Sequence, residues 1–273
     1  MDKYDHALES LRFDKKKAHK LDKIATDATP GIKNKEKGRE QLAHIVAELS
    51  DLQYRLYAEA KTALLIVFQA MDTGGKDGVV RKVFGPLNPQ GVEVTSFKRP
   101  TPDELAHDYL WRVHRRIPAR GMIGVFNRSH YEDILVPWAH KQISADEFGR
   151  RRHQINNFES HLIENGTSIL KFFLHISKAE QKRRLEERLT NPDKNWKFET
   201  GDLAERGLWD RYQDTYQMVL EQCSTGHAPW FVIPADCKWY RDWATAKIVR
   251  RELCRIHPKL PKSRTDIDGL LVK

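Results

Sequence analysis

The stretch Leu64-Leu65-Ile66-Val67-Phe68-Gln69-Ala70-Met71-Asp72-Thr73-Gly74-Gly75-Lys76-Asp77-Gly78 decides the fold of this chain. Its five leading apolar residues predict a buried strand, and the helical pattern of residues 79–84 follows it. In a phosphate-binding loop, glycines let backbone N–H groups turn toward phosphate oxygens, a helix N-terminus faces the negative charge, and a lysine reaches the terminal phosphates. Gly74, Gly75 and Lys76 supply that chemistry. We therefore predict a phosphate loop, with an ordinary glycine-rich turn as the alternative.

The loop departs from the Walker pattern GxxxxGK[ST] at two positions. Ala70 stands in place of the first glycine, and Asp77 stands in place of the hydroxyl residue that normally holds Mg²⁺. Another group must then hold the metal. Asp72 is the candidate, because a carboxylate inside the loop would repel phosphate unless a divalent cation bridged the two. The alternative is that Asp72 only caps the turn.

Outward from the loop, short β-type runs alternate with helical patterns. The predicted strands are residues 63–69, 92–97, 122–126, 169–176 and 230–233. Helical patterns begin near Lys76, Pro102, Ser144, Lys178, Asp202 and Asp242. Because parallel neighbours need crossover connections, this alternation predicts an α/β fold: a mostly parallel sheet of about five strands with helices on both faces.

The N-terminal region has a different character. The first 40 or so residues are rich in charge and lack a sustained apolar period, which is typical of an arm. From Glu36 to about Tyr57, apolar residues recur at helical spacing and predict one long amphipathic helix. We expect a single α/β domain with an N-terminal helical extension.

Composition limits the class of protein. The 273 residues are 40% hydrophobic, and the longest apolar runs are far shorter than the ~20 residues of a membrane span. Charged residues begin at Asp2 and Lys3, so we expect no signal peptide and a cytoplasmic location. The net charge of +9 favours anionic partners, among which nucleic acid, acidic lipid, nucleotides and polyanions stay open. Three widely spaced cysteines predict buried thiols rather than a disulfide or zinc site.

A second acidic site follows the run of residues 122–126. That strand ends in Asn127-Arg128-Ser129-His130-Tyr131-Glu132-Asp133. In P-loop enzymes, a strand beside the first delivers a carboxylate to the metal from its C-terminal edge, and Glu132 and Asp133 lie just beyond that edge. The alternative is that both acids only complement the dipole of the next helix. Arg128, at the strand end where phosphate would lie, favours the functional interpretation.

At this point the chain resembles the type 2 polyphosphate kinases. The matching stretches are residues 71–78, 97–101, 109–112, 126–133, 172–178, 195–198 and 228–236. They occur in order and span roughly residues 35 to 260. The similarity is therefore much more specific than the loop alone.

The resemblance implies a P-loop kinase-like three-layer sandwich with a helical lid. It divides the chain into an N-terminal arm and long helix (1–60), a kinase-like domain with the lid near 178–205 (61–260), and a C-terminal tail (261–273). It also implies reversible Mg²⁺-dependent phosphoryl transfer between inorganic polyphosphate and nucleotides, AMP or ADP giving ADP or ATP, with Mn²⁺ as a substitute metal. We expect a homo-oligomer, either a dimer or a tetramer.

The resemblance also assigns residues. It places the two metal-binding aspartates at Asp72 and Asp133, and the loop lysine at Lys76. Glu132 lies on the nucleotide side and is typical of the branch that accepts both nucleoside mono- and diphosphates.

Binding a polyanionic chain requires a row of cations. The candidates for phosphate or polyphosphate contact are Gly74, Gly75, Arg81, Arg128, Arg184 and Arg188. Arg112, Arg115 and Arg116 also fall on one predicted helical face. The alternative for the lid cations is a solvated surface, because Glu186 and Glu187 lie at helical spacing from them.

Two rival functions stay open. One is an ATP-dependent nucleotide kinase of the same fold, against which Ala70 and Asp77 argue mildly. The other is a basic nucleic-acid-binding protein with a vestigial loop, but the sequence has no aromatic RNA-reading motif and no helix-turn-helix signature. We therefore do not expect nucleic acid as a partner.

Overall fold

A parallel five-stranded sheet forms the centre of the computed structural model, which describes residues 4–14 and 20–263. Its strand order is β2-β3-β1-β4-β5, and every pair of neighbours is parallel. The strands are β1 (Ala63–Gln69), β2 (Val92–Ser96), β3 (Ile123–Asn127), β4 (Thr167–His175) and β5 (Trp230–Pro234). The predicted α/β fold with five parallel strands is confirmed.

The helices connect and cover these strands. They are α1 (Asp5–Glu9), α2 (Lys35–Glu59), α3 (Lys76–Val79), α4 (Pro102–Leu105), α5 (Trp111–His114), α6 (Glu132–Ala139), α7 (Ala145–Glu164), α8 (Lys178–Thr190), α9 (Pro192–Asn195), α10 (Gly201–Gly207), α11 (Trp209–Cys223) and α12 (Lys238–Ile256). Short 3-10 turns lie at η2 (Leu21–Lys23) and η4 (Pro89–Gly91), and a π-helical turn, η3 (Val80–Phe84), extends α3.

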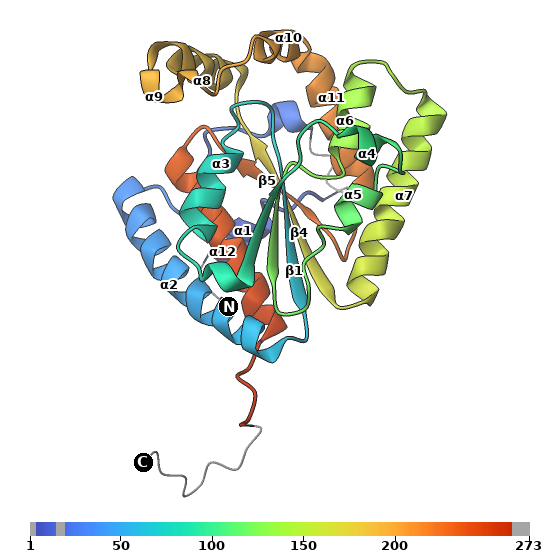
Figure 1. Cartoon of the computed structure of the whole chain (residues 1–273). Coiled ribbons are helices and arrows are strands. Elements are labelled where there is room, and N and C mark those ends of the chain that lie inside the picture. The colour runs from blue at the N-terminus through green and yellow to red at the C-terminus, as the bar shows by residue number, and fades with distance from the viewer. Residues whose placement is uncertain (1–3, 15–19, 264–273) are drawn as a thin grey trace, which may run out of the picture.

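The helices form two layers around the sheet. Helices α2, α3 and α12 cover one face, and α6, α7 and α11 cover the other (Figure 1). The helices α8, α9 and α10 lie across the end of the molecule where the strands finish (Figure 1). Because the strands are parallel, their carboxyl ends and the loops that follow them meet at this edge, which is where ligands bind in open α/β sheets.

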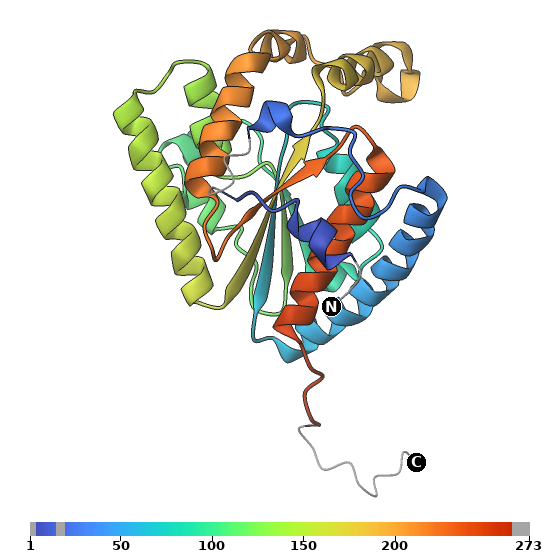
Figure 2. The same ribbon diagram turned by 180° about the vertical axis from the view of Figure 1, so that it is seen from behind.

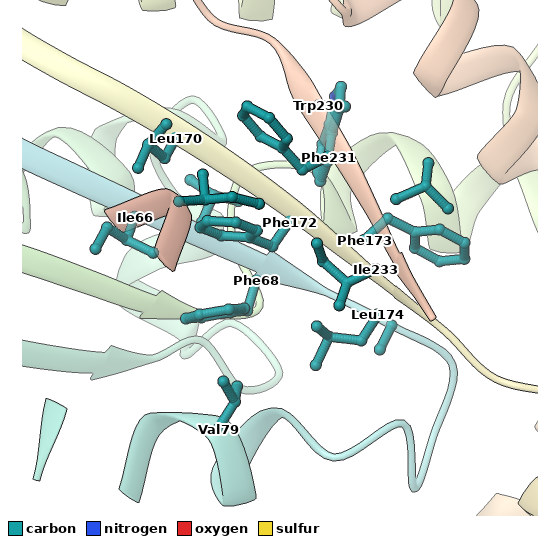
Figure 3. Packing of buried hydrophobic residues seen from close by; sticks show 14 of the residues in the cluster. Ile66, Phe68, Val79, Leu170, Phe172, Phe173, Leu174, Trp230, Phe231 and Ile233 are labelled. Atoms are coloured by element: carbon teal, nitrogen blue, oxygen red, sulfur yellow. The ribbon is translucent and has the colours of Figure 1, made fainter. Parts of the chain in front are cut away.

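Strand β1 lies at the centre because its sequence is apolar on both faces. All seven of its residues are buried. Phe68 stacks on Phe172 of β4 with 5.3 Å between ring centroids, and Phe172 packs on Phe231 of β5 (Figure 3). A strand covered on both faces needs this unbroken apolar run, so the pattern of β1 also fixes its central place.

The N-terminal segment differs from the predicted arm. Its residues Tyr4, Leu8, Leu11 and Phe13 are buried and join the main hydrophobic core. Residues around Arg12 run antiparallel to β5, with hydrogen bonds from Phe13 N to Trp230 O and from Val232 N to Leu11 O, both 2.8 Å. Figure 2 shows this dark blue segment beside the sheet. The segment thus covers an edge strand that would otherwise expose unpaired backbone groups.

The long helix α2 begins and ends close to the predicted limits. Asn34 caps it by accepting a hydrogen bond from Lys37 N at 2.8 Å, and Ala60 ends it in the left-handed conformation. Its buried face, which includes Leu49 and Leu56, packs on α12. The predicted tail, 261–273, lies almost entirely outside the described residues.

Leu49→Ala tests how firmly α2 is part of the fold. Leu49 is fully buried, so its truncation removes apolar contacts and leaves a cavity. We expect the free energy of unfolding to fall by about 2–5 kcal/mol, as for other core leucines. Urea denaturation followed by circular dichroism measures this change. A loss below about 0.5 kcal/mol, the range of a surface substitution, would contradict it.

The cysteine prediction was right for one thiol only. None of the three forms a disulfide within the described part of the chain, but Cys223 is buried, Cys237 is partly exposed and Cys254 is exposed. Among residues 4–14 and 20–263, no helix is both long and apolar enough to cross a membrane.

Candidate functional site

The loop between β1 and α3 adopts an unusual backbone. Thr73 has φ +61° and Gly75 has φ +100°, a left-handed conformation that favours glycine. A Cβ at Gly74 would lie 2.5 Å from the Cβ of Ala70 and 2.8 Å from Met71 O. Ala70 replaces a motif glycine, and its methyl group leaves no room for a side chain at position 74.

Lys76 lies under this loop and is 8% exposed. Its Nζ donates a hydrogen bond to Ala70 O at 3.0 Å, across the mouth of the loop. Burial lowers the pKa of Lys76 and the Arg128 charge lowers it further, while Asp72 and Glu132 oppose the shift. An ammonium group has three N–H donors. The hydrogen bond to Ala70 O therefore leaves Lys76 able to bind an anion at the loop.

Asp72 and Arg128 meet at the carboxyl edge of the sheet. The guanidinium Nη2 of Arg128 lies 3.1 Å from Asp72 Oδ1. Arg128 follows β3 with φ +64°, and its N–H donates to Phe68 O in β1. The two predicted loops are therefore brought together. About a quarter of the Asp72 side chain, 24%, is exposed, so the ion pair leaves it open to solvent.

The two acids at the start of α6 have different neighbours. Burial raises the pKa of Glu132, and the nearby charges of Arg128, Lys76 and Asp72 act on it as well. Burial also raises the pKa of Asp133, but its partners are Arg112 and Arg151. The Asp133 Oδ2 atom lies 3.5 Å from Arg112 Nη2. Glu132 therefore shares its surroundings with Asp72 and Lys76, whereas Asp133 faces arginines of α5 and α7.

These carboxylates do not form a closed metal cage. No group of three or more His, Cys, Asp or Glu side chains in the described part of the chain is arranged to hold a metal ion. Mg²⁺, however, usually takes one or two protein carboxylates and completes its shell with water and substrate phosphates. The Asp72 and Glu132 carboxylates, which lie close enough for the Asp72 charge to raise the pKa of Glu132, fit that kind of site.

Asp77 links three elements. Its Oδ1 accepts a hydrogen bond from Asn127 Nδ2 at 2.7 Å, and its Oδ2 lies 3.5 Å from Lys197 Nζ in the segment between α9 and α10. These contacts and Lys76 lower the pKa of Asp77 against the opposing effect of burial, which is the largest single contribution. The residue in the motif's hydroxyl position thus connects the loop, β3 and the predicted lid.

Arg184 and Arg188 hold protein groups. Arg184 is 5% exposed and donates to Thr73 O at 2.9 Å and to Ala235 O at 2.6 Å, so it braces the loop against the end of β5. Arg188 donates to Asp202 Oδ2 at 2.9 Å and to Lys197 O at 3.1 Å, inside the predicted lid. Their predicted contact with polyphosphate stays a prediction.

The remaining predicted cations are more exposed, except Arg112, which is buried and pairs with Asp133. Arg81 lies on the exposed side of η3. In α8, Lys182 pairs with Glu186 at 3.7 Å and Arg183 pairs with Glu187 at 3.8 Å, as the solvated-surface alternative describes. Arg183 also pairs with Glu180 at 2.7 Å.

A buried polar network behind α6 was missed. Lys171 Nζ donates to Glu159 Oε2 at 2.5 Å, to Tyr131 Oη at 2.9 Å and to Cys223 O at 2.8 Å. Glu159 also accepts a hydrogen bond from Tyr131 Oη at 2.8 Å, and His130 Nε2 lies 3.2 Å from it. His130 and Tyr131 directly precede the two acids of α6, so the network fixes that turn. The sequence signal was a lysine inside the apolar strand β4.

Lys171→Met tests the network. With Lys171 removed, Glu159 keeps a buried charge without its cation, and we expect the free energy of unfolding to fall by about 3–5 kcal/mol. The double variant Lys171→Met/Glu159→Gln removes both charges and should recover part of that loss. Urea denaturation measures both. A single variant as stable as the wild type would contradict the expected cost.

Comparison with known proteins places this site in a family. The family model described as "Polyphosphate kinase 2 (PPK2)" matches residues 32–259. An AMP/ADP-polyphosphate phosphotransferase of Meiothermus ruber is 48% identical over 239 residues, which are 88% of this chain and 90% of that protein. An ADP-polyphosphate phosphotransferase of Rhodopseudomonas palustris is 47% identical over 230 residues, 80% of each chain.

A solved structure agrees with these matches. The crystal structure of polyphosphate kinase 2 from Arthrobacter aurescens TC1 superposes with a TM-score of 0.93 at 44% identity, covering 96% of this chain and 93% of that one. The family match takes in the loop of Lys76, the turn that carries Arg128 and the acids of α6. The chain therefore belongs to the polyphosphate kinase 2 family.

Proposed function

We propose that this protein transfers a phosphoryl group reversibly between inorganic polyphosphate and nucleoside mono- or diphosphates. The observation that carries the proposal is the meeting of Lys76, Arg128, Asp72 and Glu132 at one edge of the sheet, between the phosphate loop and the turn after β3. Phosphoryl transfer needs little covalent chemistry from protein, and positioning and neutralising charge do most of it. This cluster supplies both.

Each residue then has a role. The loop N–H groups and Lys76 would bind the phosphate oxygens, and Arg128 would neutralise the charge that develops on the transferred group. Bound Mg²⁺, or Mn²⁺ in its place, would supply positive charge that lowers the mutual repulsion of the phosphates. Asp72 and Asp133 are the proposed ligands, and the position of Glu132 beside Asp72 makes it a further candidate.

The acceptor range rests on Glu132 and on the relatives. The name of the Meiothermus ruber relative includes both AMP and ADP, and that of the Rhodopseudomonas palustris relative includes ADP. We propose that this chain accepts both nucleotides, with ATP as the product from ADP.

The lid would exclude water from the reaction. Residues 178–205 cross the carboxyl edge of the sheet (Figure 1), and Gln181 Nε2 donates to Asp72 O at 3.2 Å. Burial is the main cause that raises the pKa of Asp202 in α10, and the negative charge of Asp72 is the second cause. Because the Asp72 charge acts on Asp202, the lid faces the loop. A closed lid keeps water from taking the phosphoryl group.

Location and assembly remain part of the proposal. Three cysteines that form no disulfide within the described residues fit a reducing cytoplasm. We also propose a homo-oligomer, dimer or tetramer, which light scattering after gel filtration would test.

A comparison of donors tests the proposed function against an ATP-dependent kinase of the same fold. The purified protein is mixed with Mg²⁺ and AMP, and either long-chain polyphosphate or ATP is the only donor. We expect ADP to form only when polyphosphate is the donor. Formation of ADP only when ATP is the donor would favour the rival. Binding of nucleic acid without transfer from either donor would favour the nucleic-acid-binding alternative.

A further inference from the structure

A buried arginine of α12 lies directly behind the phosphate loop. Arg241 is 3% exposed, and it lies one turn into the helix that follows β5. A buried guanidinium is costly unless it is paired and hydrogen-bonded. Its place beside a phosphate-binding loop therefore needs an explanation.

The guanidinium of Arg241 fills the space that Gly75 of the loop and Gly78 of α3 leave open. A Cβ built at Gly75 would lie 2.0 Å from Arg241 Nη1, and one built at Gly78 would lie 3.0 Å from Nη2. Gly75 also has φ +100°. A side chain at Gly75 would strain the backbone and displace the guanidinium, and one at Gly78 would press on Nη2.

The hydrogen bonds of Arg241 leave one side of its guanidinium free. Nε and Nη2 donate to Asp242 Oδ1 at 2.8 and 2.6 Å. Nη1, the atom that faces Gly75, has no hydrogen-bond partner among the residues that the structure describes. Asp242 thus orients the group and neutralises part of its charge, while the free N–H donors point toward the loop.

A second guanidinium lies beside the first. Arg184 Nη1 would lie 3.5 Å from a Cβ at Gly75, and it donates to Thr73 O at 2.9 Å. Together with Lys76, three cationic side chains surround one short loop. Like charges this close repel each other, and an anion at the loop relieves the repulsion.

We propose that Arg241 is a positioning residue for phosphate binding, oriented by Asp242. It holds Gly75 and Gly78 in the conformation that turns the loop N–H groups toward phosphate, and its charge raises the affinity of the loop for anions. This inference deepens the proposed function and rests on it for the identity of the anion.

Binding of inorganic tripolyphosphate without nucleotide, measured by calorimetry, tests the inference separately from transfer. We expect Arg241→Met to weaken binding about 10-fold or more, because the loop loses both its support and a nearby positive charge. Arg241→Lys keeps the charge and should recover part of that affinity. Gly78→Ala places a methyl group against Nη2 and should weaken binding without changing Arg241 itself.

A double-mutant cycle and a stability control complete the test. If both residues act through one contact, Arg241→Met/Gly78→Ala binds no more weakly than Arg241→Met alone. Leu253→Ala, in the same helix and fully buried, should lower stability but leave tripolyphosphate binding unchanged. Three results would overturn the inference. The effects of the two substitutions on binding could be additive, Leu253→Ala could lose as much binding as Arg241→Met, or Arg241→Met could bind tripolyphosphate within about twofold of wild type.

Transfer is assayed on the same variants. We expect the KM for polyphosphate to rise more than kcat falls in Arg241→Met, because the residue acts on binding. If the wild type binds tripolyphosphate and Arg241→Met does not, while no nucleotide is phosphorylated, the proposed function fails and the role of Arg241 stands.

Discussion

Replacing Lys76 with methionine should lower kcat/KM for transfer from polyphosphate to ADP by about 10²–10³-fold, the usual effect of removing one donor aimed at transition-state charge. The ammonium group is buried under the loop, and it donates a hydrogen bond to Ala70 O. Methionine fills similar space without charge, so the fold should be retained. Initial rates with ADP, polyphosphate and Mg²⁺ measure the loss.

Lys82→Met is the matched control for charge. Lys82 lies six residues further on, in η3, and its side chain is exposed. The same substitution there should leave kcat/KM within about twofold. If both variants lost activity equally, the general positive charge of the protein, rather than Lys76, would explain the rate.

Asp72→Asn should remove nearly all transfer and leave the fold intact. The amide keeps the size of the side chain and can still accept a hydrogen bond from Arg128, but it loses the negative charge that a divalent cation needs. We expect a fall of about 10³-fold, of the order reported for lost electrostatic groups in active sites. Asp133→Asn should do the same if it also holds the metal. Rates at increasing Mg²⁺ measure both.

An exposed helix-terminal acid provides the control for these variants. Asp146 lies in the first turn of α7, as Asp133 does in α6, and Asp146→Asn should leave the rate unchanged. Full activity in Asp72→Asn would remove it from the metal site. If Asp133→Asn stays active while Glu132→Gln does not, the metal is held by Asp72 and Glu132 instead.

The pH dependence follows from the same acids. Burial raises the pKa values of Glu132 and Asp133 above their ordinary values. As the pH falls, each of these two acids is therefore protonated at a higher pH than an exposed carboxyl group. Metal binding requires the ionised form of the acids. As the pH is lowered, kcat/KM should therefore begin to fall above the pH range in which exposed carboxyl groups titrate. Glu132→Gln should shift that limb if Glu132 contributes to it.

The sequence predicts those elements best whose pattern is local. Strand β1 is unbroken and apolar, and its predicted limits, residues 63–69, match the structure. The strand ends locate Asp72 and Arg128 at one edge because parallel strands finish on the same side. That they form an ion pair depends on side-chain geometry, which no local pattern contains.

The N-terminal segment and Arg241 were beyond prediction for a related reason. Tyr4, Leu8, Leu11 and Phe13 follow no sustained period, and they are buried because their segment packs on the distant elements β5 and α12. Arg241 lies among charged neighbours in the sequence, and its burial arises where α12 packs against the loop 166 residues earlier. Long-range packing decides both.

Transfer of label from polyphosphate to a nucleotide tests the central claim most directly. Polyphosphate carrying ³²P is mixed with the protein, Mg²⁺ and unlabelled ADP, with no ATP present, and the nucleotides are separated. We predict ATP labelled in its terminal phosphate, at a rate that Lys76→Met lowers strongly and Lys82→Met does not. Unlabelled nucleotides in the presence of intact, folded protein would contradict the account.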